Sequence, residues 1–394
     1  MSTTWRPLSE VKDDLSVKWY RTKLEPEVLR GLLARSNLKG LAQSLGHLLL
    51  YLATGTLSFW LWYRQIWVGF AAAALVHGAV TRFLWAGVHE LIHGTVFRTK
   101  WLNKPFLNIF SILSWFNHVD YAASHTYHHI YTLYRDADRE NLLPLSPAPG
   151  VIGWIRVCIL NMSGRAGSSF ASGGFISTVL LCFRIAFGFR PRSSAPSIEW
   201  LDALHKEHPK EARRSAWWCR FALLFHGAVV AVSIVTGLWV LPIIVTLAAF
   251  IGNIGLFAVG LPQHCGLKDN NPDFRKSTRS IKLGPVLTFL YWYMNWHLGH
   301  HMYAAVPCYN LRKLSRVIAD DTPVPKSMFG AWKEMREIWR RQQSDPSYQY
   351  EVPLPGTATP WPAPAGAGTS RSDAVADATD AASSVDEMAP DDLL

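Results

Sequence analysis

Histidine is concentrated in three short stretches of this 394-residue chain, which read HELIH, HTYHH and HLGHH. Residues at positions i, i+3 and i+4 share one face of a helix, so each stretch can present two or three imidazoles to one point. The eight histidines are His89, His93, His125, His128, His129, His297, His300 and His301. Converging imidazoles predict metal binding, because neutral imidazole is a common ligand of Zn, Cu, Fe and Ni.

Taken alone, HELIH matches the zinc-protease pattern, in which two histidines hold one zinc and the glutamate between them acts as a base. Glu90 would be that base. The alternative is that Glu90 orients a ligand histidine through a hydrogen bond. A single zinc with one further ligand would leave most of the other clustered histidines without a role.

The elements that must position these residues are apolar segments of membrane-spanning length. The chain is 49% hydrophobic and 17% charged, and it contains 18 Trp and 19 Phe. Uncharged or nearly uncharged runs of about 20 residues predict membrane spans. The four predicted spans are 42–62, 66–86, 217–239 and 243–262. Short connections pair them into two hairpins.

The distribution of basic residues predicts the orientation of these hairpins. The formal net charge is +10, and nearly all Lys and Arg residues lie outside the two hairpin turns. The positive-inside rule therefore places both termini and residues 87–216 in the cytosol. Five cysteines without a C-x-x-C pair also favour a reducing compartment. The basic residues are scattered rather than arranged in a stripe, so nucleic acid is not expected as a partner.

These elements define the expected fold. It is an all-α integral membrane protein with four transmembrane helices in two hairpins and a cytosolic helical cap that holds the metal site. Residues 1–41 form a cytosolic N-terminal segment and residues 42–345 the membrane and catalytic domain. Residues 346–394 are acidic and rich in Pro and Ala, which predicts a disordered tail.

A ninth histidine, His264, follows the last predicted span as closely as His89 follows the second. All nine are then expected at the cytosolic membrane face. One metal takes at most about six ligands, so nine imidazoles imply two metals. Imidazole alone does not choose the element, but the cytosolic location, the membrane and the absence of Cys ligands favour a pair of redox-active irons.

The three histidine boxes around two membrane hairpins resemble the membrane fatty acid desaturase and hydroxylase superfamily, over residues 40–345. The resemblance implies a non-haem diiron centre held by the nine histidines, with O2 as cosubstrate. His264 matches the extra histidine of that family. Some acyl-CoA desaturases have a longer first box and an Asn four residues before the extra histidine, where this chain has Gly260.

The resemblance also implies partners and a location. Electrons would come from a separate donor, a cytochrome b5 or ferredoxin-type carrier with its reductase, because EHPK (207–210) lacks the H-P-G-G haem motif. The bilayer would supply a fatty acyl or other apolar substrate, in the endoplasmic reticulum or the bacterial inner membrane. Desaturation is preferred. The alternatives are hydroxylation or ketolation of a small hydrophobic metabolite, a zinc membrane peptidase and a metal-storing protein.

The remaining histidines have more ordinary interpretations. His47, His77 and His226 lie inside predicted spans and are expected to be hydrogen-bonded packing residues. His205 and His208 are expected on a solvated charged face. Three residues have two possible interpretations, as side chains that contact the ligand histidines or as ordinary residues without a role in the site: His118, Asp136 and Asp138. NPDF (271–274) is interpreted as a turn.

Overall fold

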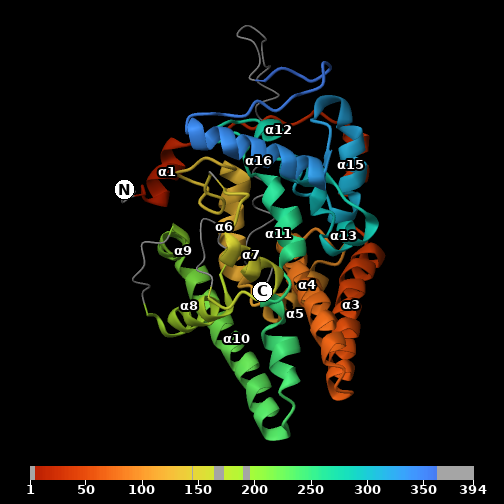
Figure 1. The fold of residues 1–394 in the computed structure, drawn as a ribbon. Coiled ribbons are helices and arrows are strands. Elements are labelled where there is room, and N and C mark those ends of the chain that lie inside the picture. Colours follow the sequence, from red (N-terminus) through yellow and green to blue (C-terminus); the bar gives the residue numbers. More distant parts are fainter. Residues whose placement is uncertain (1–4, 144, 164–172, 190–195, 362–394) are drawn as a thin grey trace.

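Two long helical legs extend from one side of the molecule (Figure 1). The computed structural model describes residues 5–143, 145–163, 173–189 and 196–361. The first leg is the hairpin of α3 (Asn37–Tyr63) and α4 (Trp67–Ile92), and the second contains α10 (Pro209–Thr236). Within the described residues, these three helices are the ones long and apolar enough to cross a membrane. The chain is therefore a membrane protein by the character of its helices.

The expected fourth span, 243–262, is not one continuous helix. It begins as a π-helix, η2 (Pro242–Thr246), continues as a 3-10 turn, η3 (Ala248–Phe250), and resumes as α11 (Ile254–Gly260). Gly252 has a φ of +62°, and a Cβ there would lie 2.5 Å from the Leu75 carbonyl oxygen on α4. On α4, a Cβ at Gly78 would clash with the Ile251 carbonyl oxygen. The segment breaks because its backbone packs directly against α4 through these two glycines.

The other α-helices are shorter, and most of them lie at one end of the legs (Figure 1). They are α1 (Leu8–Asp14), α2 (Pro26–Leu33), α5 (Asn103–Leu113), α6 (His118–Tyr131), α7 (Val151–Cys158), α8 (Phe175–Phe187), α9 (Pro196–Glu207), α12 (Phe274–Ser277), α13 (Pro285–Leu290), α14 (His297–Met302), α15 (Leu311–Val317) and α16 (Met328–Ser344). Short 3-10 turns are η1 (Lys100–Leu102), η4 (Leu261–Gln263), η5 (Met294–Trp296), η6 (Cys308–Asn310) and η7 (Ala319–Asp321). Strand β1 (Ile281–Lys282) pairs in parallel with β2 (Lys326–Ser327).

The main hydrophobic core lies where α4 enters this helical end. Phe83, Phe110 and Trp292 are almost completely buried there. Gly87 allows the close approach, because a Cβ at this position would lie 2.7 Å from the Phe110 ring and 2.9 Å from the Trp292 ring. The core therefore joins α4, α5 and the chain just before α14, and it fixes the end of α4 that carries His89.

The three histidines inside the legs are hydrogen-bonded packing residues, as expected. His47 Nε2 lies 3.1 Å from the Val80 carbonyl oxygen. His77 Nε2 lies 2.7 Å from the Ile244 oxygen, and His226 Nε2 lies 3.1 Å from the Ile112 oxygen. Each bond satisfies a buried polar group. The bond of His47 joins α3 to α4 within the first leg, and the other two link a leg to a neighbouring segment.

Residues 346–361, the first part of the tail that the sequence predicts to be disordered, make several contacts with the body. The Thr359 amide donates to Asp321 Oδ1 at 2.7 Å, and Arg275 Nη2 donates to the Thr359 carbonyl oxygen at 2.9 Å. Glu351 forms ion pairs with Lys268 and Lys276. The rest of the expected tail, 362–394, lies outside the described residues.

Candidate metal centre

Four separate segments bring the nine predicted histidines together. His89 occupies the last turn of α4, and His93 follows directly after that helix. The second box lies on α6, whose N-terminus is capped by the Asn117 side chain, which accepts hydrogen bonds from two backbone amides. His264 follows the 3-10 turn η4, and the third box forms α14.

The nine side chains form two groups, in each of which the potential ligand atoms lie within 4.8 Å of one another. The first group is His89, His93, His125, His129 and His300, and the second is His128, His264, His297 and His301. Each H-x-x-H-H box is divided between the groups. This division places α6 and α14 between the two groups, with side chains pointing to both.

The two groups are adjacent and almost entirely buried. Within the first, the ring centroids of His89 and His125 are 4.4 Å apart. Within the second, those of His128 and His301 are 4.9 Å apart. The rings of His129 and His301, which belong to different groups, are 4.6 Å apart. Two ions held by these groups would therefore be close neighbours, as a cooperating metal pair requires.

The donor atoms fit a metal in each group. His89 Nε2 and both ring nitrogens of His93 and His300 are buried and have no hydrogen-bond partner among the described residues. In the second group, His297 Nε2 lies 3.0 Å from His264 Nε2 and 3.1 Å from His301 Nε2. Three imidazole nitrogens converging on one another in a buried space have unsatisfied lone pairs, which a cation can accept.

Three of the histidine rings are held at Nδ1 by carboxylate or carbonyl oxygens that surround the two groups. His128 Nδ1 is 2.8 Å from Asp138 Oδ2, and His125 Nδ1 is 3.3 Å from Glu140 Oε1. His264 Nδ1 lies 2.9 Å from the Ser277 carbonyl oxygen. Such contacts fix the tautomer and ring orientation, and direct Nε2 toward the centre of the group.

Glu90 holds another ring in the same way. Its Oε1 lies 3.0 Å from His89 Nδ1, so it orients a histidine of the first group. Both histidines of HELIH belong to a group of five, and this geometry supports the orienting role over that of a protease base. Asp138, which the sequence left open, contacts His128, whereas Asp136 is exposed. Sequence reasoning missed Glu140, because its fifteen-residue separation from His125 has no periodic signal.

Burial sets the charge state of the site. It lowers the pKa of most of these histidines well below the ordinary value, with neighbouring imidazoles adding to the effect: His125, His129, His297, His300 and His301. Burial also lowers the pKa of His264 to about 3. For His128 burial is outweighed by Asp138, which raises the pKa. Neutral imidazole is the form that binds a metal.

The histidines at positions 118, 205 and 208 belong to neither group. His118 is buried, and its ring centroid is 6.5 Å from that of Trp218. The solvated face expected at His205 and His208 is only partly exposed, because both residues are half-buried. His205 pairs with Asp120 at 2.8 Å, because α9 packs against α6. His208, which immediately precedes α10, lies 3.1 Å from the Tyr127 hydroxyl.

Membrane-length helices with two buried groups of imidazoles at one end define a membrane-embedded, histidine-rich protein with the donor set of a two-metal centre. A family model described as fatty acid desaturase matches residues 65–329, and the chain belongs to this family. It is accordingly an oxidoreductase of the desaturase and hydroxylase type, a class that uses two irons and acts on lipids in a membrane. No curated protein matches the chain.

Proposed function

We propose that this protein catalyses the O2-dependent oxidation of an unactivated C–H bond in a fatty acyl or other apolar substrate, with desaturation as the preferred outcome. Two irons would be held by the nine histidines, five in the first group and four in the second. The observation that carries this proposal is the division of the nine buried imidazoles into two adjacent groups.

When bound, the metal pair supplies activation of O2 and removal of hydrogen from carbon. Desaturation consumes O2, two electrons and two protons, removes hydrogen from two adjacent carbons and releases two waters. Hydroxylation uses the same inputs, places one oxygen atom in the substrate and releases one water. The placement of the substrate carbon decides between the two outcomes.

The protein's own side chains prepare the site for either reaction. Burial keeps water from the imidazoles and favours their neutral form. Glu90, Glu140 and Asp138 hold three ligand rings by Nδ1, which limits the directions in which Nε2 can point. A pre-oriented set of ligands holds two ions with little reorganisation during the reaction.

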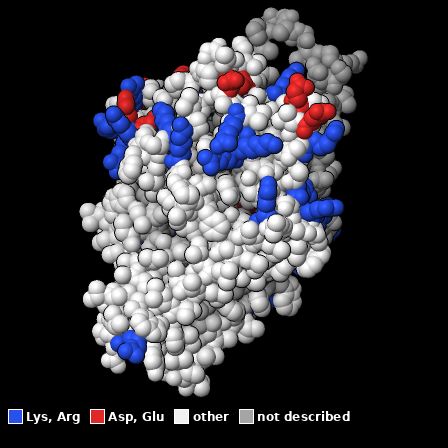
Figure 2. Space-filling view, turned by 90° about the vertical axis from the view of Figure 1, so that its right-hand side faces the viewer, with Lys and Arg blue, Asp and Glu red and all other residues white. Residues whose placement is uncertain are grey.

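The surface supports a multi-pass orientation with the site at the cytosolic membrane face. Figure 2 shows charged side chains gathered on the upper half of the molecule, whereas the lower half is almost free of them. Many outward-facing residues of the legs are apolar, including Val68 on α4 and Val235 on α10, both 86% exposed. Trp62 and Trp239 meet near the far end of the legs, as aromatic residues do at a membrane boundary.

We infer the topology from this pattern. The α3–α4 hairpin would cross the bilayer twice, and α10 with the irregular segment after it would cross twice more. Both termini would lie in the cytosol. The membrane would be either the endoplasmic reticulum or the bacterial inner membrane. An apolar substrate would then arrive from the lipid, and a cytochrome b5 or ferredoxin-type carrier would deliver electrons from the cytosol.

Metal analysis of the purified protein tests the proposal. We expect two irons per chain and a loss of iron in His300→Ala and His128→Ala, which remove one ligand from each group. His118→Ala is the matched control, because His118 is also buried but belongs to neither group. One zinc per chain, retained by both ligand variants, would favour a peptidase and contradict the proposal.

Product analysis separates the remaining alternatives. The protein would be expressed with a compatible reductase and its lipids analysed by untargeted mass spectrometry. A product lighter by two hydrogen atoms indicates desaturation, and one heavier by an oxygen atom indicates hydroxylation. No change in any lipid or small apolar metabolite, despite bound iron and reductase, would favour metal storage.

A further inference from the structure

His264 is the histidine whose position depends most on other parts of the chain. It belongs to none of the three boxes and lies in a turn rather than on a long helix. Its Nδ1 lies 2.9 Å from the Ser277 carbonyl oxygen, and its Nε2 lies 3.0 Å from His297 Nε2. A ring on such a turn can reach the second group only if the turn itself is held in place.

Arg279 holds this turn from both sides of His264. Its backbone amide donates to the Gln263 carbonyl oxygen at 2.8 Å. Its Nη1 donates to the carbonyl oxygens of Pro262 and Cys265, the latter at 3.1 Å. One residue therefore binds three backbone carbonyls within two positions of His264. The Arg279 side chain is only 7% exposed, so water does not compete strongly for these contacts.

Glu334 on α16 holds the guanidinium in turn. Arg279 donates through Nε at 3.1 Å and through Nη2 at 2.9 Å to the same oxygen, Oε1. The other oxygen, Oε2, accepts from Lys326 and from the Tyr350 hydroxyl, the latter at 2.7 Å. Burial would raise the pKa of Glu334, but Arg279 and Lys326 outweigh it and keep the pKa below its usual value.

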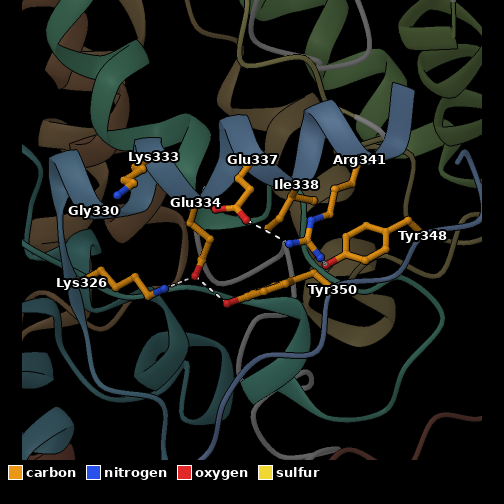
Figure 3. Close-up of a pocket in the computed structure, with 9 residues that line it drawn as sticks. All are labelled: Lys326, Gly330, Lys333, Glu334, Glu337, Ile338, Arg341, Tyr348 and Tyr350. Atoms are coloured by element: carbon orange, nitrogen blue, oxygen red, sulfur yellow. Dashed lines mark hydrogen bonds and ion pairs between the residues drawn. The ribbon is translucent and has the colours of Figure 1, made fainter. Parts of the chain in front are cut away.

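A surface cavity lies beside this ion pair. Figure 3 shows Glu334 pointing from α16 toward Lys326 and Tyr350, which line the cavity with it. On the same helix, Ile338 packs against Gly266, where a Cβ would lie 3.1 Å from its side chain and where φ is +76°. The helix α16 thus contacts the turn that carries His264 in two ways, through Glu334 and Arg279 and through Ile338.

We propose that Arg279, held by Glu334, is a positioning residue that keeps His264 in the second group of histidines. The proposal rests on the proposed function, because it assumes that the second group binds a metal. It predicts that loosening Arg279 weakens one metal site and spares the other, since none of the residues that Arg279 contacts belongs to the first group.

Anaerobic titration of the metal-free protein with ferrous iron tests the idea. Wild-type protein is expected to bind two irons. In Arg279→Gln, the affinity of one site should fall by about 10- to 100-fold, as is usual when a group that orients a ligand is lost, and the other site should be unchanged. Arg279→Lys keeps a cation against Glu334 and should recover part of the loss.

Two further variants separate positioning from general loosening of α16. Lys326→Met removes a partner of the other Glu334 oxygen without touching Arg279, and it should leave both affinities unchanged. Should Arg279→Gln not fold, Glu334→Gln gives the same test in milder form and should weaken the same single site. Two unchanged affinities in a folded variant with reduced thermal stability would overturn the proposal. Wild-type protein that binds no iron would instead contradict the proposed function.

Discussion

Asp138 Oδ2 lies 2.8 Å from Nδ1 of His128, and the same oxygen accepts the Leu133 amide at 2.8 Å. The carboxylate is fully buried and its second oxygen accepts the Glu140 amide at 3.0 Å. Although burial opposes ionisation, His128 and the backbone amides hold the pKa of Asp138 below its usual value. The loop after α6 is therefore built around a charged group that orients a histidine.

We predict that Asp138→Asn weakens metal binding by about 10- to 100-fold, because the amide holds the ring of His128 less strongly. Iron content and affinity of the purified variant give the measurement. Asp136→Asn is the control, since Asp136 lies in the same YRDADREN loop but is exposed. Equal iron binding by the two variants would show that the contact with Asp138 has no role in orienting His128.

Stability should depend on pH through the pairing of α9 with α6. His205 Nε2 lies 2.8 Å from Asp120 Oδ1. Burial lowers the pKa of His205, but Asp120 and Asp202 outweigh it and raise the pKa above its ordinary value. Because the folded pKa exceeds the unfolded one, this stabilisation is complete below about pH 6.5 and is lost as the pH rises through the folded pKa.

Thermal unfolding of the detergent-solubilised protein at several pH values measures this effect. Wild-type protein should be more stable than His205→Gln by about 1 kcal/mol at acidic pH, with the difference shrinking toward alkaline pH. A difference that stays constant across this range would argue that His205 contributes by packing rather than by charge.

The close contact between α4 and the irregular segment predicts a strong effect of a single methyl group. Gly78→Ala should destabilise the protein by about 1–3 kcal/mol, because the new Cβ would meet the Ile251 backbone. Gly227 on α10 is the matched control, since a Cβ added there would have nothing within 4 Å among the described residues. Gly227→Ala should therefore be neutral or slightly stabilising. Similar melting temperatures for both variants would contradict this account.

The contacts of residues 346–361 predict a sharp difference between two truncations. A chain ending at residue 345 loses the hydrogen bonds of Thr359 to Asp321 and Arg275, as well as the ion pairs of Glu351, and should unfold at a lower temperature. A chain ending at residue 361 keeps them and should melt close to the full-length protein. Equal melting of the two truncated chains would mean that these contacts contribute little.

Much of the candidate site could be predicted from the sequence. The spacing within the boxes is local, so the periodicity of a helix was enough to indicate that the histidines of each box lie close together. The lengths of the uncharged apolar runs predicted the helices α3, α4 and α10, because the length of such a run is also a local property of the sequence. The hydrogen bonds of His47, His77 and His226 also followed from the cost of burying a polar ring without a partner.

The sequence did not determine how the boxes divide or what supports them. His128 and His129 are neighbours in the chain, yet they belong to different groups, because α6 lies between the two groups and presents side chains to both. Glu140, Arg279 and Glu334 act through contacts between segments distant in sequence, and the break at Gly252 results from its packing against α4. The local sequence determines which side chains are present and how they are spaced along a helix. Only the tertiary structure decides which of them meet, because that depends on how the helices pack against one another.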